Sequence, residues 1–466
     1  DAEREQYEKQ LVEALVNDSA YVNAVRNSDR QNARDEGYAA IRRIAAESTD
    51  MRFQKLYHDN AEFRNGLRND VLAAAYKEVS QRENIDVEQS EPSQEQLSAV
   101  YIPLDGEWPG FPNVETAQNA ALEEFRKETR RGARNFRITD DHLGEGGAKA
   151  KCRANIEAIR LLKYLEENVF QASPEQQEVL SRYVGWGGIP EVFDESKSEW
   201  SKEYAELKSL LTPEEYEAAR GSTLNAHYTS PAVIKAIYEA LGSMGFEGGR
   251  ILEPSMGVGN FFGLLPESMT NSQLYGVELD SITGRIAKQL YPEASITVAG
   301  FETMNRPSYF DLAVGNVPFG QYQVHDPEYD RLGVSIHNYF AVKMLDQVRP
   351  GGIVAFVTSR YTLDAKDESV RCYLAERGEL LGAIRLPNNA FRANAGTDVV
   401  SDIIFLQRRE APATELPDWV HVGTTPEGFT VNRYFIDNPD MVLGTPSAES
   451  AQYGRQDYTV APIEGA

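Results

Sequence analysis

The segment from Glu253 to Phe261, with the sequence Glu-Pro-Ser-Met-Gly-Val-Gly-Asn-Phe, combines a carboxylate with two closely spaced glycines. It follows an apolar run at 250–252, so we expect it to turn from a strand into a helix. Glycines let the backbone approach a ligand closely, and the start of a helix offers free N–H groups. By itself, such a Gly-rich segment is equally typical of an ordinary tight turn and of an unrelated nucleotide-binding site. The carboxylate of Glu253 favours a ligand with a cationic end, and we assign Pro254, Gly257, Gly259 and Phe261 to the same binding loop.

A second acidic position, Glu278, ends the apolar run 275–277 roughly 20 residues after the glycines, the spacing at which nucleotide-binding folds place a ribose ligand. An acidic side chain at such a strand tip accepts hydrogen bonds from ribose hydroxyls, so Glu278 is the ribose candidate. Asp280 is expected to cap the following helix. S-adenosylmethionine has both a ribose and a cationic methionine end. The Glu253 carboxylate suits the amino group of that end, whereas a phosphate-binding loop would have no reason to attract it.

The residues Asn316, Val317, Pro318 and Phe319 follow the apolar run 310–315. An amino group conjugated to an aromatic ring is a weak nucleophile because its lone pair is delocalised into the ring. A carboxamide oxygen and the carbonyl of Val317, each accepting one N–H, would draw the nitrogen toward tetrahedral geometry, while Phe319 stacks on the ring. The motif predicts catalysis at such an amino group, although alone it is also typical of a Pro-containing turn.

Short apolar runs alternate with helical patterns from residue 250 onward, which predicts a doubly wound, mainly parallel α/β sheet. We expect the last strand, 402–407, to pair antiparallel with the run before it. The predicted strands lie at 250–252, 274–277, 312–314, 353–357, 380–384 and 402–407.

The part of the chain before the sheet is mainly helical in pattern. Apolar residues recur at helical spacing over 3–83, a polar linker is expected at 86–96, a loop at 101–112, and helices at 117–131 and 149–168. We therefore divide the chain into a helical N-terminal region (1–96), a mainly helical connecting region (97–220), a catalytic domain (221–410) and a C-terminal extension (411–466).

Composition restricts the possible environment and partners. The two cysteines, Cys152 and Cys372, lie far apart without ligand-spaced neighbours, which predicts neither disulfides nor a metal site and fits a reducing cytoplasm. No run approaches the roughly 20 apolar residues of a membrane span, so no membrane association is expected. The net charge of −25 argues against strong unaided binding to nucleic acid, because that affinity comes largely from Lys and Arg.

The three motifs together resemble the amino-methyltransferases with an Asn-Pro-Pro-Tyr/Phe motif, especially the γ-ordered N6-adenine DNA methyltransferases, in which the cofactor motif also comes first. The segment His227-Tyr228-Thr229-Ser230-Pro231 resembles their aromatic-Thr-Pro segment, which implies that Tyr228 and Thr229 line the methionine pocket. The resemblance covers about 225–409, including Leu386-Pro387-Asn388. It implies a Rossmann-like methyltransferase sheet that binds S-adenosylmethionine and acts on DNA.

Two further segments, 138–147 and Tyr183-Val184-Gly185-Trp186-Gly187-Gly188, resemble sequences that precede the methylase domain of large methylase-helicase proteins of conjugative elements, plasmids and phages. This resemblance implies that the chain is a piece of a longer protein with a helicase region fused downstream. We expect Trp186 to pack beneath the catalytic domain, with base stacking as the alternative.

The sequence departs from the family pattern at two positions. Val317 replaces the first Pro of the motif, so its additional N–H needs a partner and activity below the family norm is expected. Gly300 stands where relatives commonly carry an Asp that binds the cofactor's adenine amino group. We expect Glu302 to substitute for this carboxylate and Phe301 to pack on the adenine ring.

The predicted activity is methyl transfer to the N6 amino group of adenine in DNA, with the base flipped into the Asn-Val-Pro-Phe pocket. A protein glutamine methyltransferase is the enzymatic alternative, because a carboxamide nitrogen poses the same chemical problem. The other alternative is a degenerate methyltransferase fold that serves as a binding or scaffolding module of a mobile element.

Overall fold

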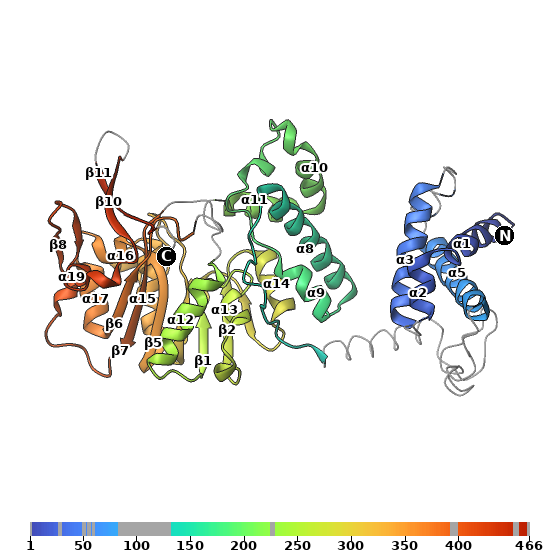
Figure 1. Ribbon diagram of the computed structural model, residues 1–466. Helices are drawn as coiled ribbons and strands as arrows, with labels where there is room; N and C mark the ends of the chain where they lie inside the picture. Colours follow the sequence, from blue (N-terminus) through green and yellow to red (C-terminus); the bar gives the residue numbers. More distant parts are fainter. Residues whose placement is uncertain are drawn as a thin grey trace. The chain divides into compact units, whose positions relative to one another are not determined.

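The computed structural model describes residues 2–26, 30–48, 53, 57, 61–82, 132–223, 229–391, 399–450 and 456–463. The chain consists of two compact units, Asp1–Val114 and Glu115–Ala466 (Figure 1). The linker, loop and helix that we predict at 86–96, 101–112 and 117–131 lie outside the described residues.

The first unit is helical, as its apolar spacing predicts. Its helices are α1 (Ala2–Leu15), α2 (Ser19–Arg26), α3 (Arg30–Glu47) and α5 (Ala61–Arg82). Leu11, Leu15, Ile41 and Leu67 are among the side chains that form its core. This unit has a hydrophobic core of its own.

The second unit is built on a seven-stranded sheet in the order β3-β2-β1-β4-β5-β7-β6. The pairs from β3 to β5 are parallel, and β7 is antiparallel to both of its neighbours, as predicted for 402–407. The strands are β1 (Arg250–Glu253), β2 (Gln273–Glu278), β3 (Ser295–Val298), β4 (Phe310–Asn316), β5 (Val348–Ser359), β6 (Gly378–Arg385) and β7 (Ser401–Arg408). Strand order reverses between β1 and β4, where open α/β sheets bind their ligands.

Helices cover both faces of this sheet. Alternate residues of β4 separate the two layers: Leu312 and Val314 belong to the core that contains α12 and α14, and Phe310 and Ala313 to the core that contains α15 and α17. The helices are α8 (Ala148–Asn168), α9 (Pro174–Ser181), α10 (Ser201–Leu210), α11 (Pro213–Ser222), α12 (Pro231–Ser243), α13 (Asn260–Gly263), α14 (Ser281–Leu290), α15 (Ile336–Gln347), α16 (Tyr361–Asp364), α17 (Ser369–Arg377) and α19 (Arg433–Asp437).

Shorter elements connect and extend this core. The 3₁₀ turns are η1 (Pro190–Phe193), η2 (Ser198–Trp200), η3 (Glu267–Met269), η4 (Phe301–Thr303), η5 (Asp330–Leu332), η6 (Asp418–Val420) and η7 (Pro439–Met441). After β7, β8 (Val422–Thr424) pairs with β9 (Thr430–Asn432), and β10 (Thr445–Ser450) pairs with β11 (Gln456–Ala461).

Local sequence explains where the helices next to the site begin. Thr212 caps α11 in a capping box with Glu215, and Pro213 occupies the first turn. Ser230 and Asp280 cap α12 and α14 by accepting from Val233 N and Thr283 N. The predicted cap at Asp280 is therefore confirmed.

The predicted fold class is confirmed: a Rossmann-like methyltransferase sheet follows a mainly helical region. None of the helices in the described part combines the length and the apolar composition that crossing a bilayer requires.

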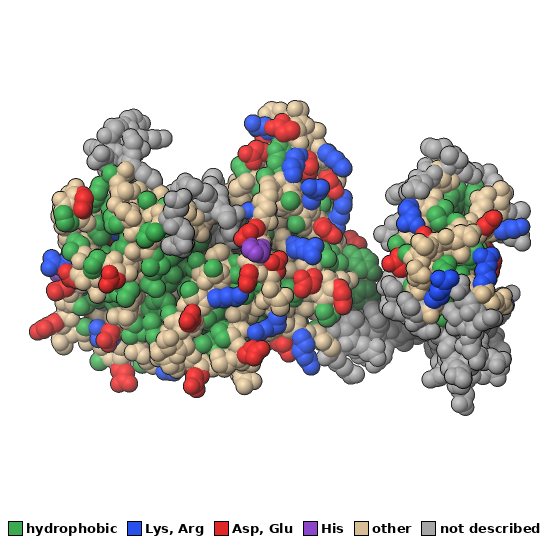
Figure 2. Space-filling model, viewed as in Figure 1, with side chains coloured by type: hydrophobic (Ala, Val, Ile, Leu, Met, Phe, Trp, Pro, Cys, Tyr) green, Lys and Arg blue, Asp and Glu red, His purple; other side chains and the backbone are tan. Residues whose placement is uncertain are grey.

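The visible face of the protein carries both signs of charge. Figure 2 shows Lys and Arg side chains next to Asp and Glu over α8 and α10. Lys149 pairs with Glu203 at 2.7 Å, and Arg160 pairs with Glu206. These cations are therefore largely neutralised within the protein.

Candidate active site

A cavity of about 550 Å³ opens where strand order reverses, at the carboxyl ends of β1, β2 and β4. Glu253, Glu278 and Asn316 are the last residues of these three strands. The predicted site residues that line the cavity are Thr229, Glu253, Pro254, Gly257, Phe261, Glu278, Phe301, Glu302, Asn316, Val317, Pro318 and Phe319. Tyr228 lies outside the described residues.

The two glycines of the cofactor loop have different surroundings. Both have positive φ, 55° for Gly257 and 88° for Gly259, a region that L side chains rarely adopt. Gly257 lines the cavity, whereas Gly259 is not among the lining residues. A Cβ atom on Gly259 would lie 2.5 Å from the Tyr291 ring, so this glycine permits close packing behind the loop. Its contact with a cofactor stays a prediction.

Glu278 joins the cofactor loop to the tip of β2. Its carboxylate accepts from Gly257 N and from Asp280 N, each at 2.8 Å. Burial raises the pKa of the Glu278 carboxyl to about 7, against the opposing effect of these backbone N–H groups. The group therefore holds a proton more readily than an exposed Glu.

Glu253 is a buried carboxyl group without a full set of partners. The residue is 2% exposed, and its Oε2 atom has no hydrogen-bond partner among the described residues. Burial, followed by the nearby charge of Glu278, raises the pKa of Glu253 well above its usual range. Because a buried unpartnered polar atom is costly, this oxygen indicates a ligand position that suits a cation.

Aromatic rings form another wall of the cavity. The ring centroids of Phe301 and Phe340 lie 5.0 Å apart with an interplanar angle of 34°, and both residues line the cavity. Lys343 Nζ lies 5.0 Å from the centre of the Phe301 ring and forms a buried ion pair with Asp326. These contacts hold Phe301 against α15 at the cavity wall.

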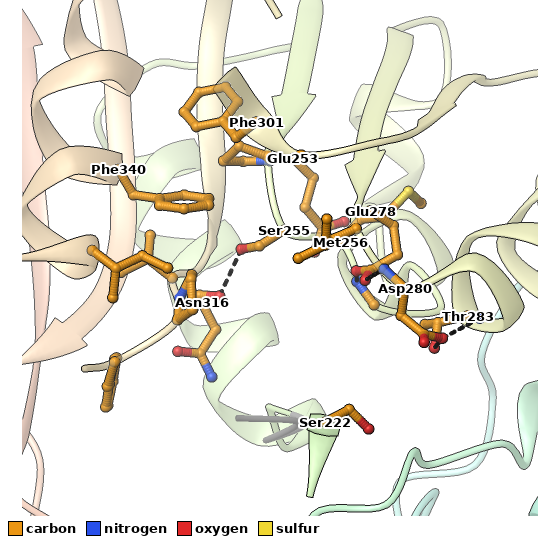
Figure 3. Close-up of a pocket in the computed structure, with 18 of the residues that line it drawn as sticks. Ser222, Glu253, Ser255, Met256, Glu278, Asp280, Thr283, Phe301, Asn316 and Phe340 are labelled. Atoms are coloured by element: carbon orange, nitrogen blue, oxygen red, sulfur yellow. Dashed lines mark hydrogen bonds between the residues drawn. The ribbon is translucent and has the colours of Figure 1, made fainter. Parts of the chain in front are cut away.

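The predicted catalytic motif begins at the end of β4. The Asn316 side chain extends into the cavity, while its backbone carbonyl accepts from Ser255 Oγ at 2.9 Å (Figure 3). Val317 N donates to the carbonyl of Val357 on β5 at 3.1 Å. The additional N–H created by the replacement of Pro therefore has a partner, and the pairing of β4 with β5 continues into the motif.

Sequence reasoning missed several residues of the cavity wall. Some belong to the connecting region, and others to α14, α15 or the segment after β6. They include Gly185, Gly221, Ser222, Thr283, Tyr339, Phe340, Phe391 and Val399. Of these, Gly185 lies in a segment that we singled out by resemblance, but nothing in that motif indicated that it faces a cavity. Trp186 beside it is 1% exposed, so its predicted packing role is confirmed.

Comparison with known proteins agrees with this geometry. Residues 213–418 match the family model for N-6 DNA Methylase. "Defense against restriction protein B" of Escherichia phage P1 is 28% identical over 289 residues, which cover 60% of this chain and 11% of that protein. "Type II methyltransferase M.CvrRI" of Paramecium bursaria Chlorella virus XZ-6E is 33% identical over 92 residues, covering 20% of this chain and 24% of that protein. The matched regions thus span about a tenth and about a quarter of these two relatives.

A solved structure described as the modification subunit of a type I restriction enzyme from Vibrio vulnificus YJ016 is 16% identical, with a TM-score of 0.36. It covers 62% of this chain and 67% of its own. The fold assignment rests on the strand order described above. The resemblance is confirmed for residues 213–418, which match the N-6 DNA Methylase family and carry its methyltransferase fold.

Proposed function

We propose that this chain transfers a methyl group from S-adenosylmethionine to the N6 amino group of adenine in DNA. One observation carries the proposal: the Asn316 carboxamide and the unpartnered Glu253 carboxyl line the same cavity. The first suits a conjugated amino group and the second a cationic cofactor. The family match at 213–418 supports DNA as the substrate class.

The cavity residues fit the proposed cofactor group by group. The unpartnered Glu253 oxygen suits the cationic methionine end, and the buried Thr229 lies just before the N-terminus of α12, which suits a carboxylate. Glu278, Phe301 and Phe340 line the same cavity, which supports our proposal that Glu278 accepts from the ribose hydroxyls and that the two rings hold the adenine. When bound, S-adenosylmethionine would supply an electrophilic methyl group.

The chain's own residues would activate the acceptor nitrogen. The Asn316 carboxamide oxygen and the Val317 carbonyl each accept one N–H, which localises the nitrogen lone pair toward the methyl carbon. Bound S-adenosylmethionine would supply the methyl group and leave as S-adenosylhomocysteine, and the methylated nitrogen would release one proton to solvent water. Phe319 stacks on the flipped base. The hydrogen bonds from Ser255 to Asn316 and from Val317 to Val357 hold the motif for this step.

DNA contacts outside the cavity are expected to be weak in this chain. Its net charge is −25, and Lys149 and Arg160 on α8 are paired with Glu203 and Glu206 on α10. We infer that much of the DNA affinity comes from the rest of a longer protein, which we expect to carry a helicase region downstream.

The test is incorporation of labelled methyl groups into unmethylated single- and double-stranded DNA, followed by nucleoside analysis. We expect N6-methyladenine from the wild type and none from Asn316→Ala, with S-adenosylhomocysteine binding retained in both. Cofactor binding without transfer to DNA at any protein concentration would overturn the proposal and favour a scaffold. Labelling of a glutamine-containing peptide in place of DNA would favour the protein methyltransferase.

A further inference from the structure

Part of the cavity wall comes from helices that precede the sheet, and the proposed chemistry gives these helices no role. Gly185, from the segment after α9, lines the cavity. Gly221 and Ser222 line it from the last turn of α11. The Gly185 segment is defined here as residues 183–186, and a helix that precedes the sheet holds it.

A single buried side chain holds the backbone on both sides of the peptide that joins Val184 to Gly185. Asn155 on α8 is fully buried, and its Nδ2 donates to the Gly185 carbonyl at 2.6 Å. Its Oδ1 accepts from Val184 N at 2.9 Å. Because both ends of one planar amide are used, the segment can neither slide nor rotate without leaving a buried polar group unsatisfied.

Aromatic packing supports the segment from below. Trp186 is 1% exposed and meets the Phe193 ring edge-on, with centroids 5.3 Å apart. Tyr183 is 2% exposed and meets Trp186 edge-on, with ring centroids 6.4 Å apart. Between these two anchored rings, Gly185 adopts a φ of 67°, a left-handed conformation that L side chains rarely adopt.

The segment also reaches the tip of β2. Burial raises the pKa of the Tyr183 hydroxyl, and Asp280 and Thr283 lie close enough to act on it as well. Both of these residues line the cavity, and Asp280 N donates to the Glu278 carboxylate. Gly185 and the ribose candidate Glu278 thus line the same cavity, and Asn155 holds the segment that carries Gly185.

We propose that the Gly185 segment closes the ribose side of the cofactor site, with Gly185 touching the ligand and Asn155 as a positioning residue. The ligand class is an adenine nucleoside, so the inference rests on the proposed cofactor. It extends the binding site beyond the methyltransferase sheet into α8. The helices before the sheet are then part of the cofactor site.

Two glycines of the same motif provide a matched test. Gly188 also has a left-handed φ, 77°, but is not among the residues that line the cavity. Gly185→Ala and Gly188→Ala should therefore strain the backbone to a similar extent and lower Tm by similar amounts. Only Gly185→Ala should weaken the binding of adenosine and of S-adenosylhomocysteine, raising each dissociation constant roughly tenfold in calorimetric titration.

Asn155 supplies a graded variant pair. Asn155→Asp keeps an acceptor for Val184 N but places a second oxygen against the Gly185 carbonyl, so it should weaken adenosine binding at least as much as Asn155→Ala does. Equal losses for Gly185→Ala and Gly188→Ala, or none for either, would overturn the inference while leaving the proposed function intact. A wild-type protein that binds neither ligand would overturn both, and one that binds them without methylating DNA would overturn the proposed function alone.

Discussion

The Glu302 carboxylate occupies the space that a Cβ atom on Gly300 would need. Both residues line the cavity beside Phe301. The position where family members carry an Asp side chain is thus filled by a carboxylate that comes from two residues further along the chain. This arrangement supports our prediction that Glu302 replaces the missing Asp.

A swap of the two positions tests this replacement. Glu302→Ala should weaken the binding of S-adenosylhomocysteine by roughly tenfold, because it removes one hydrogen bond to a charged group. Gly300→Asp alone should displace the flexible Glu302 carboxylate and repel its charge, whereas the double variant Gly300→Asp, Glu302→Ala should recover most of the affinity. Isothermal titration of the three variants provides the measurement. Unchanged affinity in Glu302→Ala would show that the carboxylate has no role in cofactor binding, and a double variant no better than Glu302→Ala would show that a carboxylate at position 300 cannot replace it.

Val317→Pro would restore the common family motif but remove the hydrogen bond to the Val357 carbonyl. We expect it to lower the free energy of unfolding by about 1–3 kcal/mol, because a buried acceptor loses its donor. Methyl transfer should not increase, since the β4–β5 pairing already orders the motif. Denaturant unfolding and the DNA assay measure the two effects, with Val317→Ala as the control that keeps the N–H. A faster and equally stable Pro variant would contradict this expectation.

The raised pKa of Glu278 predicts pH-dependent ribose binding. Its folded value of about 7 lies above the ordinary 4.5, so the ligand-free fold keeps a proton that the unfolded chain releases. The contribution of Glu278 to stability therefore falls as pH rises from about 4.5 to about 7. Ionised Glu278 accepts ribose hydroxyls more strongly, so adenosine should bind several-fold tighter at pH 8 than at pH 6.

Adenosine is the suitable probe for this effect because it lacks the titratable amino group of the cofactor. Glu278→Gln should bind adenosine with little change between the two pH values. The same slope in wild type and Glu278→Gln would assign the titration to another group, with Glu253 the first to examine.

The buried pair of Lys343 and Asp326 should contribute far more to stability than a surface pair. The side chains are 3% and 8% exposed, with Nζ and Oδ2 2.7 Å apart. Lys343→Met leaves the Asp326 charge without its cation, which should cost about 3–5 kcal/mol of unfolding free energy. Arg220→Ala, which breaks an exposed pair with Glu217, should cost about 1 kcal/mol or less. Similar losses of unfolding free energy in the two variants would show that the buried pair is no more important for stability than the exposed pair.

The motifs and most elements of the sheet were readable from the sequence because their determinants are local. A buried strand is a short apolar run, and the tips at Glu253, Glu278 and Asn316 are marked by the polar residue that ends each run. The cap at Asp280 is equally local. By contrast β3, half-exposed at the edge of the sheet, and the short strands after β7 have little apolar periodicity, so their sequences did not identify them.

Only the tertiary structure decided what the motifs meet. Strand order, with β1 between β2 and β4, brings three strand tips to one cavity although they are far apart in the chain. Three features depend on residues that are distant in sequence. They are the hydrogen bond from Val317 N to β5, the unpartnered oxygen of Glu253, and the hydrogen bonds between Asn155 and the Gly185 segment. Composition and spacing are properties of neighbouring residues, whereas these contacts exist only after helices and strands have packed together.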